Sequence, residues 1–140
     1  MLRQALDRDI PGILRLEGML FSNSMSEAQI AIELRVGRGF VLEAAVDNPV
    51  LGYILVRDDG AVLDITRLAV DPAQQRAGVG TELLRHVLAM NRPTVLAVKK
   101  GNHRAIRLYT RHGFVVTGHF IEERAWAMRR DVAPSDRPST

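Results

Sequence analysis

The sequence predicts a mixed α/β domain of the α+β kind, with a mostly antiparallel central sheet of about seven strands and four helices. Segments rich in β-branched and aliphatic residues alternate along the chain with segments whose apolar residues recur every three or four positions. Glycine, proline and aspartate separate these segments and indicate short turns. The 140 residues, of which 46% are hydrophobic and 25% charged, are enough for one packed core. The predicted element order is β-α-α-β-β-β-α-β-α-β-β.

The first third of the chain predicts one short strand and two helices. Residues 2–6 are typical of a strand, and the acids at positions 7–9 precede a helix that begins near Ile10. Ser26 and Gln29 have the spacing of a capping box for a second helix, which Gly37 and Gly39 end. The apolar stripe expected on the first helix consists of Ile10, Ile13, Leu14, Leu16, Met19, Leu20 and Phe21.

The remaining strands follow from β-branched runs and the turns between them. A meander of three antiparallel strands is expected over residues 40–46, 50–57 and 61–70, with hairpin turns at 47–49 and 58–60. A helix then leads to a strand over 93–98, which a crossover makes parallel to its neighbour. A fourth helix from residue 102 and two strands over 114–120 and 124–130 complete the predicted single domain, residues 1–130. Residues 131–140 hold two prolines, two serines and few apolar residues, which predicts a disordered tail.

The most informative stretch runs from Leu68 to Leu84 and predicts a strand, a tight loop and a helix. Gly78 and Gly80 lie where the helix begins, so their lack of side chains allows a ligand to reach the unpaired N–H groups of the first turn. The helix dipole and Arg76 add positive potential there. The stretch therefore predicts a phosphate-binding site, although an ordinary glycine-containing turn would have a similar pattern.

Two motifs in this order are similar to those of one superfamily. The pattern Gln75-x-x-Gly78-x-Gly80 after Leu-Ala-Val-Asp-Pro closely resembles the pyrophosphate-binding motif of the GNAT superfamily of N-acetyltransferases. The block from Asn102 to Phe114, with Asn-x-x-Ala, Leu-Tyr and Gly-Phe, resembles the helix and turn that follow it in that family. The resemblance covers roughly residues 1–130 and implies the GNAT fold, with acetyl-CoA (coenzyme A) as the cosubstrate.

The resemblance also implies roles for individual residues. A backbone N–H at Val70 or its neighbour would meet the thioester carbonyl, and Tyr109 would protonate the departing thiolate as the catalytic acid. Without the resemblance, Asn102 is only a helix N-cap and Tyr109 only a core aromatic. The residues implied to bind the cosubstrate are Leu68, Ala69, Val70, Gln75, Arg76, Ala77, Gly78, Val79, Gly80, Thr81, Asn102 and Tyr109.

Asp64 is the candidate catalytic base. It lies fourteen residues before Gly78, where histone-type members of the superfamily have a catalytic glutamate that it resembles. A salt bridge or a surface position would explain this acid equally well. Strict alternation places Val62, Asp64, Thr66 and Leu68 on one face of the strand and Leu63, Ile65 and Arg67 on the other.

A narrower resemblance concerns the acceptor. The block from Leu16-Glu17 through Phe21 to Ser26 is similar to the ribosomal-protein alanine N-acetyltransferases, in which the two N-terminal helices commonly shape the acceptor site. Met25 stands where those enzymes have tryptophan, and Ala97 stands where they have glutamate. These departures leave the acceptor open, as a small-molecule amine or a protein N-terminus.

Composition limits the other functions. There is no cysteine for thiolate chemistry, and none of the four histidines has a partner at metal-ligand spacing, so no metal is expected. No apolar run is long enough to span a membrane, so a cytoplasmic protein without membrane contact is expected. The expected oligomeric state is a monomer or a homodimer. A net charge of +3 gives little reason to expect a nucleic-acid partner. The alternatives kept are a non-catalytic acyl-CoA-binding module and an acetyltransferase that acts on aminoacyl-tRNA.

Overall fold

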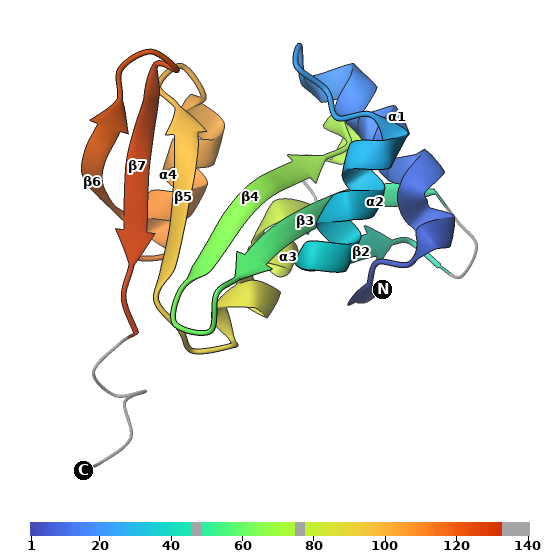
Figure 1. Cartoon of the computed structure of the whole chain (residues 1–140), viewed down its shortest axis with the longest axis horizontal. Helices are drawn as coiled ribbons and strands as arrows, with labels where there is room; N and C mark the ends of the chain where they lie inside the picture. The colour runs from blue at the N-terminus through green and yellow to red at the C-terminus, as the bar shows by residue number, and fades with distance from the viewer. Residues whose placement is uncertain (46–48, 75–77, 133–140) are drawn as a thin grey trace.

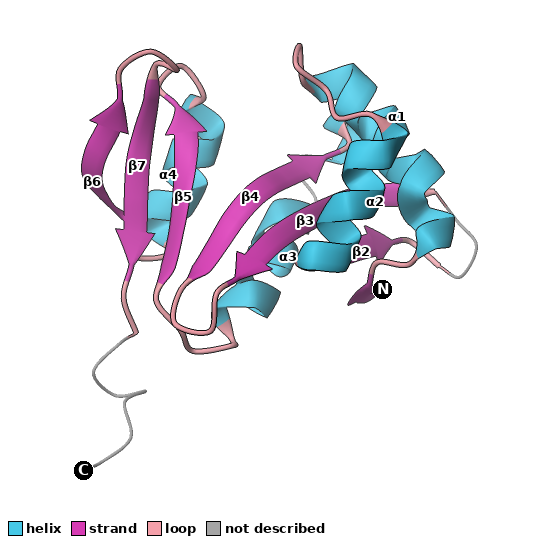
Figure 2. Cartoon of the chain, viewed as in Figure 1, coloured by secondary structure: helices cyan, strands magenta, loops and turns pink. Residues whose placement is uncertain are grey.

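Seven strands form one sheet in the computed structural model, which describes residues 1–45, 49–74 and 78–132 (Figures 1 and 2). The strand order is β1-β2-β3-β4-β5-β7-β6. All neighbours are antiparallel except β4 and β5, which are parallel as predicted. The strands are β1 (Leu2–Gln4), β2 (Arg38–Glu43), β3 (Val50–Asp58), β4 (Leu63–Val70), β5 (Thr94–Lys99), β6 (Val115–Phe120) and β7 (Ala125–Arg130).

Helices cover both faces of the sheet (Figure 2). The first pair, α1 and α2, packs on the face turned toward the viewer, and the second pair, α3 and α4, packs behind it. The predicted element order is confirmed. The helices are α1 (Ile10–Leu20), α2 (Glu27–Val36), α3 (Val79–Leu88) and α4 (His103–Arg111), with short 3₁₀ turns at Asp7–Asp9 and Pro72–Gln74. Within the described ranges, no helix is long and apolar enough to cross a membrane.

Each face of the sheet has its own hydrophobic core, and β3 contributes to both. Tyr53 and Leu55 pack toward α1 and α2, while Ile54 and Val56 pack toward α3. Strict alternation therefore buries both faces of this strand, which explains why its sequence is almost wholly apolar. The stripe predicted on α1 is confirmed in part. Ile10, Ile13 and Leu16 are buried, but Leu14 and Met19 are exposed.

Local signals in the sequence determine both ends of α2. The Ser26 hydroxyl accepts a hydrogen bond from the Gln29 N–H, and the Gln29 side chain accepts one from the Ser26 N–H, which confirms the capping box. Gly37 follows α2 as its C-terminal cap. The tail prediction for residues 131–140 falls mostly on residues 133–140, and the predicted turn at 47–49 mostly on 46–48; both lie outside the described residues.

An extra residue in β4 changes which side chains share a face. Leu55 pairs with Arg67 and Val56 pairs with Ile65, so Thr66 has no partner position of its own and forms a bulge. Leu63, Ile65 and Leu68 consequently face α3, whereas Ala69 faces α1 and α2. The prediction that Asp64 and Leu68 share one face is wrong, because it assumed strict alternation through Thr66.

The strands β4 and β5 separate soon after they meet. Their parallel pairing joins Leu63–Ile65 to Thr94–Leu96, after which the strands diverge (Figure 1). The C-terminal part of β4 therefore has an edge that is open toward β5. This divergence creates the site described next.

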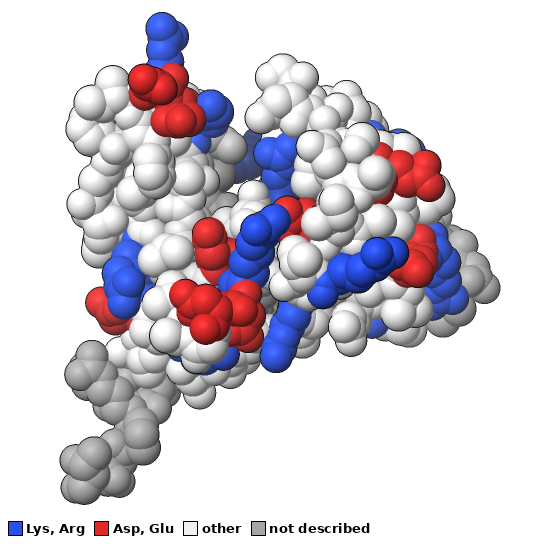
Figure 3. All heavy atoms as spheres, in the orientation of Figure 1, with Lys and Arg blue, Asp and Glu red and all other residues white. Residues whose placement is uncertain are grey.

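Charged side chains of both signs are interspersed over the face that carries α1 and α2 (Figure 3). Arg57 pairs with Glu33, and Arg38 and Arg92 both pair with Asp58. Alternating signs of this kind are typical of a solvated protein surface.

Candidate active site between the diverging strands

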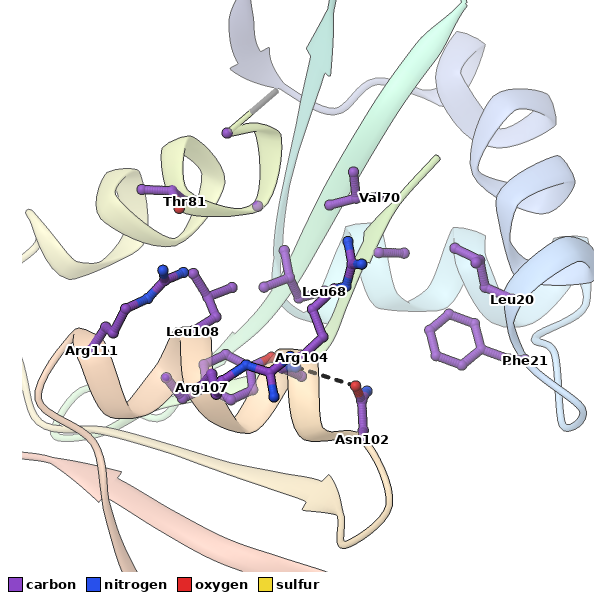
Figure 4. Close-up of a pocket in the computed structure, with 15 residues that line it drawn as sticks. Leu20, Phe21, Leu68, Val70, Thr81, Asn102, Arg104, Arg107, Leu108 and Arg111 are labelled. Carbon is purple, nitrogen blue, oxygen red and sulfur yellow. Dashed lines mark hydrogen bonds between the residues drawn. The ribbon is translucent and has the colours of Figure 1, made fainter. Parts of the chain in front are cut away.

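A cavity of about 440 Å³ lies between the C-terminal part of β4, the start of α3 and one side of α4 (Figure 4). Leu20 and Phe21 from the end of α1 form the opposite wall. The site therefore joins segments that are far apart in the sequence. Of the predicted cosubstrate-binding residues, those that line this first cavity are Leu68, Ala69, Val70, Gly78, Gly80, Thr81, Asn102 and Tyr109.

The start of α3 brings two glycines and the first N–H groups of the helix to the first cavity. Gly78 is the N-cap in the left-handed conformation, with φ of 79°, and a Cβ atom there would meet no atom within 4 Å. A Cβ on Gly80 would approach Val70 and Leu108 at 3.5 Å. The missing side chains thus keep the first N–H groups of the helix accessible from the cavity, which suits a phosphate.

The other predicted cosubstrate-binding residues fall into two groups. Gln75, Arg76 and Ala77 lie outside the described residues. The side chain of Val79 is buried in the core, where it anchors the first turn of α3, and the part of Val79 that a ligand could reach is its backbone N–H. The helix is held against the sheet by the apolar positions that its spacing predicted, namely Val79, Leu83, Leu84, Val87 and Leu88.

Three arginines on α4 give the cavity a basic wall that the sequence analysis missed. Arg104, Arg107 and Arg111 recur at intervals of three and four residues, so they share one side of the helix. Figure 4 shows the side chains of Arg104 and Arg111 reaching from α4 toward β4 and α3. Among the described carboxylates, none lies within ion-pair distance of these three arginines. The wall therefore favours a ligand with several negative charges.

The open edge of β4 presents backbone donors to the first cavity. The Asp71 N–H donates to the Leu51 carbonyl at 2.8 Å, and hydrogen-bonded pairs alternate along an antiparallel ladder. Ala69 therefore belongs to a pair bonded to β3, while the N–H groups of Leu68 and Val70 point toward β5. Because β5 has diverged at this level, these groups are placed to bind a carbonyl oxygen in the gap.

Asn102 and Tyr109 bring polar groups from α4. The Asn102 side-chain oxygen accepts a hydrogen bond from the Ala105 N–H at 3.2 Å, so Asn102 is the N-cap as well as a cavity residue. Tyr109 is 6% exposed and its ring packs edge-on against Phe114 at 5.6 Å. Burial raises the pKa of Tyr109, so the phenol keeps its proton at neutral pH. A protonated hydroxyl beside the cavity can donate a proton.

Asp64 lies apart from the first cavity. Its neighbours Leu63 and Ile65 face α3, so its side chain points to the side of α1 and α2, where it is paired across the ladder with Arg57. The pKa of Asp64 is raised, chiefly by partial burial. The positive charge of Arg57 lowers this pKa, and the negative charge of Glu33 raises it further, so that the net change is a rise. Its role as a base stays a prediction.

A second cavity, of about 520 Å³, lies on the side of the sheet to which Asp64 points. Thr66 and Arg67 of β4 line it, together with Gln29 and Glu33 of α2. The segment between α1 and α2 completes it with Asn23, Ser24 and Met25. Phe21 of the first cavity and Arg67 of the second are in direct contact, with the guanidinium 3.9 Å from the ring centre.

An ion pair that the sequence did not reveal lies beneath this contact. Arg67 donates to both oxygens of the buried Glu17 carboxylate at 3.0 Å, and the Tyr53 hydroxyl and the Met25 N–H donate to the same carboxylate. Burial alone would raise the pKa of Glu17, but the Arg67, Met25 and Tyr53 hydrogen bonds hold it below its usual value. Glu17 is therefore ionised and fully paired.

Comparison with known proteins identified similar folds. Ard1 from Thermoplasma volcanium has a TM-score of 0.81 and 25% identity over 95% of this chain and 97% of its own. The ribosomal-protein-S18-alanine N-acetyltransferase from Escherichia coli has a TM-score of 0.80 and 21% identity over 99% of each chain. The PaiA N-acetyltransferase from Thermoplasma acidophilum, solved in complex with coenzyme A, has a TM-score of 0.79 and 14% identity over 94% and 98%. A search of curated proteins found no match.

A family model gives the assignment. The model described as the acetyltransferase (GNAT) family matches residues 9–114, which is more than half of the chain. The matched range contains the start of α3 with Gly78 and Gly80, the open edge of β4 and the whole of α4. The chain belongs to the GNAT family of acetyltransferases.

Proposed function

We propose that this protein transfers the acetyl group of acetyl-CoA to a primary amine, either of a small molecule or of a protein or peptide N-terminus. The observation that carries the proposal is the first cavity, in which a helix start with accessible N–H groups, three arginines and an open strand edge meet. These features suit a ligand with phosphates at one end and a carbonyl group at the other. The coenzyme A bound to the PaiA enzyme supports acetyl-CoA as the cosubstrate.

The residues of the cavity have complementary roles in this reaction. The start of α3 and the α4 arginines hold the phosphates, and the N–H of Val70 or Leu68 stabilises the negative charge that develops on the carbonyl oxygen. The amine nitrogen forms a bond to the acetyl carbon as the carbon–sulfur bond breaks. Tyr109 donates its proton to the departing thiolate.

The acceptor amine is expected to approach from the second cavity. The first cavity lies on the side of α3 and α4, so a bound cosubstrate leaves the carbonyl accessible from the opposite side of the β4 edge. Thr66 and Arg67 line the second cavity on that side. Asp64 points to the same side and is our candidate base, directly or through a water molecule.

Replacing Asp64 with Asn should lower kcat/KM most at pH values above the pKa of Asp64 but below that of the amine, and least where the amine is already neutral. The substitution keeps the size and polarity of the side chain but removes the base. Because the pKa of Asp64 is raised, its base form is lost as pH falls through that value, so the wild-type rate should decline there. Profiles of kcat/KM against pH test this, and superimposable profiles of the two proteins would exclude Asp64 as the base.

Replacing Gly78 with Val should abolish the stabilisation of the fold by coenzyme A. The left-handed conformation strains a branched residue by about 1–2 kcal/mol, and the new side chain would occupy the space left for a phosphate. Gly60→Val is the matched control, because Gly60 also has a positive φ, of 94°, and an open environment, but lies in a turn outside the cavity. Both variants should lose stability, and only Gly60→Val should still respond to coenzyme A in thermal unfolding. A response retained by Gly78→Val would contradict the assignment of the phosphate site.

One observation favours a non-catalytic acyl-CoA-binding module as the second candidate. Ala97, where the ribosomal-protein enzymes have a glutamate, is exposed on β5 and brings no acid or base to the gap. Release of thiol from acetyl-CoA, measured across a panel of small amines and short peptides, separates the two functions. Amine-dependent release supports acetyl transfer, whereas tight binding of coenzyme A without release for any amine would support the binding module.

A further inference from the structure

Arg67 holds the segment that connects α1 to α2 through two separate contacts. Its guanidinium lies over the ring of Phe21, 3.9 Å from the centre, and donates to the backbone carbonyl of Asn23 at 3.2 Å. The same group donates from Nε and Nη2 to the two oxygens of Glu17. One side chain of β4 thus contacts the beginning and the middle of the segment.

Glu17 fixes the other end of the same segment. Its carboxylate accepts a hydrogen bond from the Met25 N–H at 2.7 Å, and it is fully buried. The Phe21 N–H donates to the Glu17 backbone carbonyl at 3.0 Å. The ion pair of Glu17 with Arg67 therefore contacts the segment from Phe21 to Met25 at both of its ends.

The two cavities share this segment as a wall. Phe21 lines the first cavity, whereas Asn23, Ser24 and Met25 line the second. Arg67 is the connection, because it lines the second cavity while it stacks on the Phe21 ring. An unbroken series of contacts thus runs from Phe21 in the first cavity through Arg67 and Glu17 to Met25 in the second.

We propose that Arg67 is a positioning residue that couples the two cavities, so that cosubstrate bound in the first orders the acceptor-side segment Asn23–Met25 of the second. The inference rests on the proposed function, since it takes coenzyme A as the ligand of the first cavity. The coupling requires the planar guanidinium, which stacks on an aromatic ring and binds a carboxylate with two parallel hydrogen bonds. A lysine ammonium retains the charge but cannot form both contacts with fixed geometry.

The experiment is amide hydrogen exchange at Met25, with and without saturating coenzyme A. This N–H reports the segment directly, because it exchanges only when its bond to Glu17 opens. In the wild type, coenzyme A should slow exchange at Met25 by about 5- to 150-fold, the usual range of coupling between two sites. In Arg67→Lys, exchange should be faster without ligand, and coenzyme A should leave it nearly unchanged.

The matched control is Arg57→Lys. Arg57 also donates from Nε and Nη2 to a carboxylate, that of Glu33, which lines the second cavity, but Arg57 forms no hydrogen bond or cation–π contact with the segment from Phe21 to Met25. This variant should keep the wild-type response at Met25. Should Arg67→Lys fail to fold, Phe21→Leu keeps an apolar side chain and removes the stacked ring, and it should lose the response in the same way.

The outcomes separate this inference from the proposed function. Calorimetry that shows no binding of coenzyme A to the wild type would overturn both. Binding without any change of exchange at Met25 would overturn the coupling alone. A response in Arg67→Lys equal to that of the wild type would also overturn it, because a purely structural ion pair would shift stability without changing how Met25 responds to ligand.

Discussion

Tyr109→Phe should lower kcat by roughly ten- to a thousandfold with little change in the affinity for coenzyme A. The ring that packs against Phe114 is retained, and only the hydroxyl is lost. Burial raises the pKa of this tyrosine, so the wild-type group is protonated and able to act as an acid throughout the neutral range. The reaction should therefore show no loss attributable to Tyr109 until the solution is strongly alkaline.

Steady-state kinetics with an accepted amine and calorimetry with coenzyme A measure these two quantities on the same variant. A packing role predicts the opposite pattern, namely weaker binding or a lower melting temperature with kcat close to that of the wild type. A Phe variant with wild-type kcat would therefore restrict Tyr109 to the core.

Arg67→Met should lower the free energy of unfolding by about 3–5 kcal/mol near neutral pH, since it leaves a buried carboxylate without its cation. Glu17 is wholly buried, and the pKa of Glu17 is below its usual value in the folded protein. A carboxylate whose pKa is lower in the folded protein than in the unfolded chain stabilises the fold at pH values above its unfolded pKa. This stabilisation is lost as the pH falls through the pKa of the folded protein. The wild type should consequently lose more stability than the variant on acidification.

Urea unfolding at neutral and acidic pH measures the effect. The difference in the free energy of unfolding between the wild type and Arg67→Met should be largest at neutral pH. It should become smaller toward low pH, where Glu17 becomes protonated in both proteins. An equal difference at every pH would show that the loss comes from packing of the arginine stem and not from the charge of Glu17.

The parts of the fold that the sequence predicted depend on local patterns. All five apolar positions expected on α3 are buried, because a helix with a 3.6-residue period presents them to one side whatever lies there. The capping box at Ser26 formed for the same reason, since its hydrogen bonds join residues three apart. The parallel pairing of β5 with β4 followed from the crossover helix between them.

The parts that were missed depend on contacts between distant segments. The bulge at Thr66 extends a regular alternation by one residue, and it is defined only by the register against β3. The pairing of Glu17 with Arg67 spans fifty positions, and each residue alone resembles an ordinary surface charge. The basic wall of α4 was also missed, although it depends on no distant contact. The spacing of its arginines, three and four residues, was visible in the sequence and indicates one basic side of a helix.

The central claim is that the first cavity binds acetyl-CoA, and thermal unfolding in the presence of coenzyme A tests it most directly. A ligand at one hundred times its dissociation constant stabilises a fold by about 2.7 kcal/mol. The melting temperature of the wild type should therefore rise by several degrees, and the rise should grow with coenzyme A concentration. An unchanged melting temperature in millimolar coenzyme A would contradict the account.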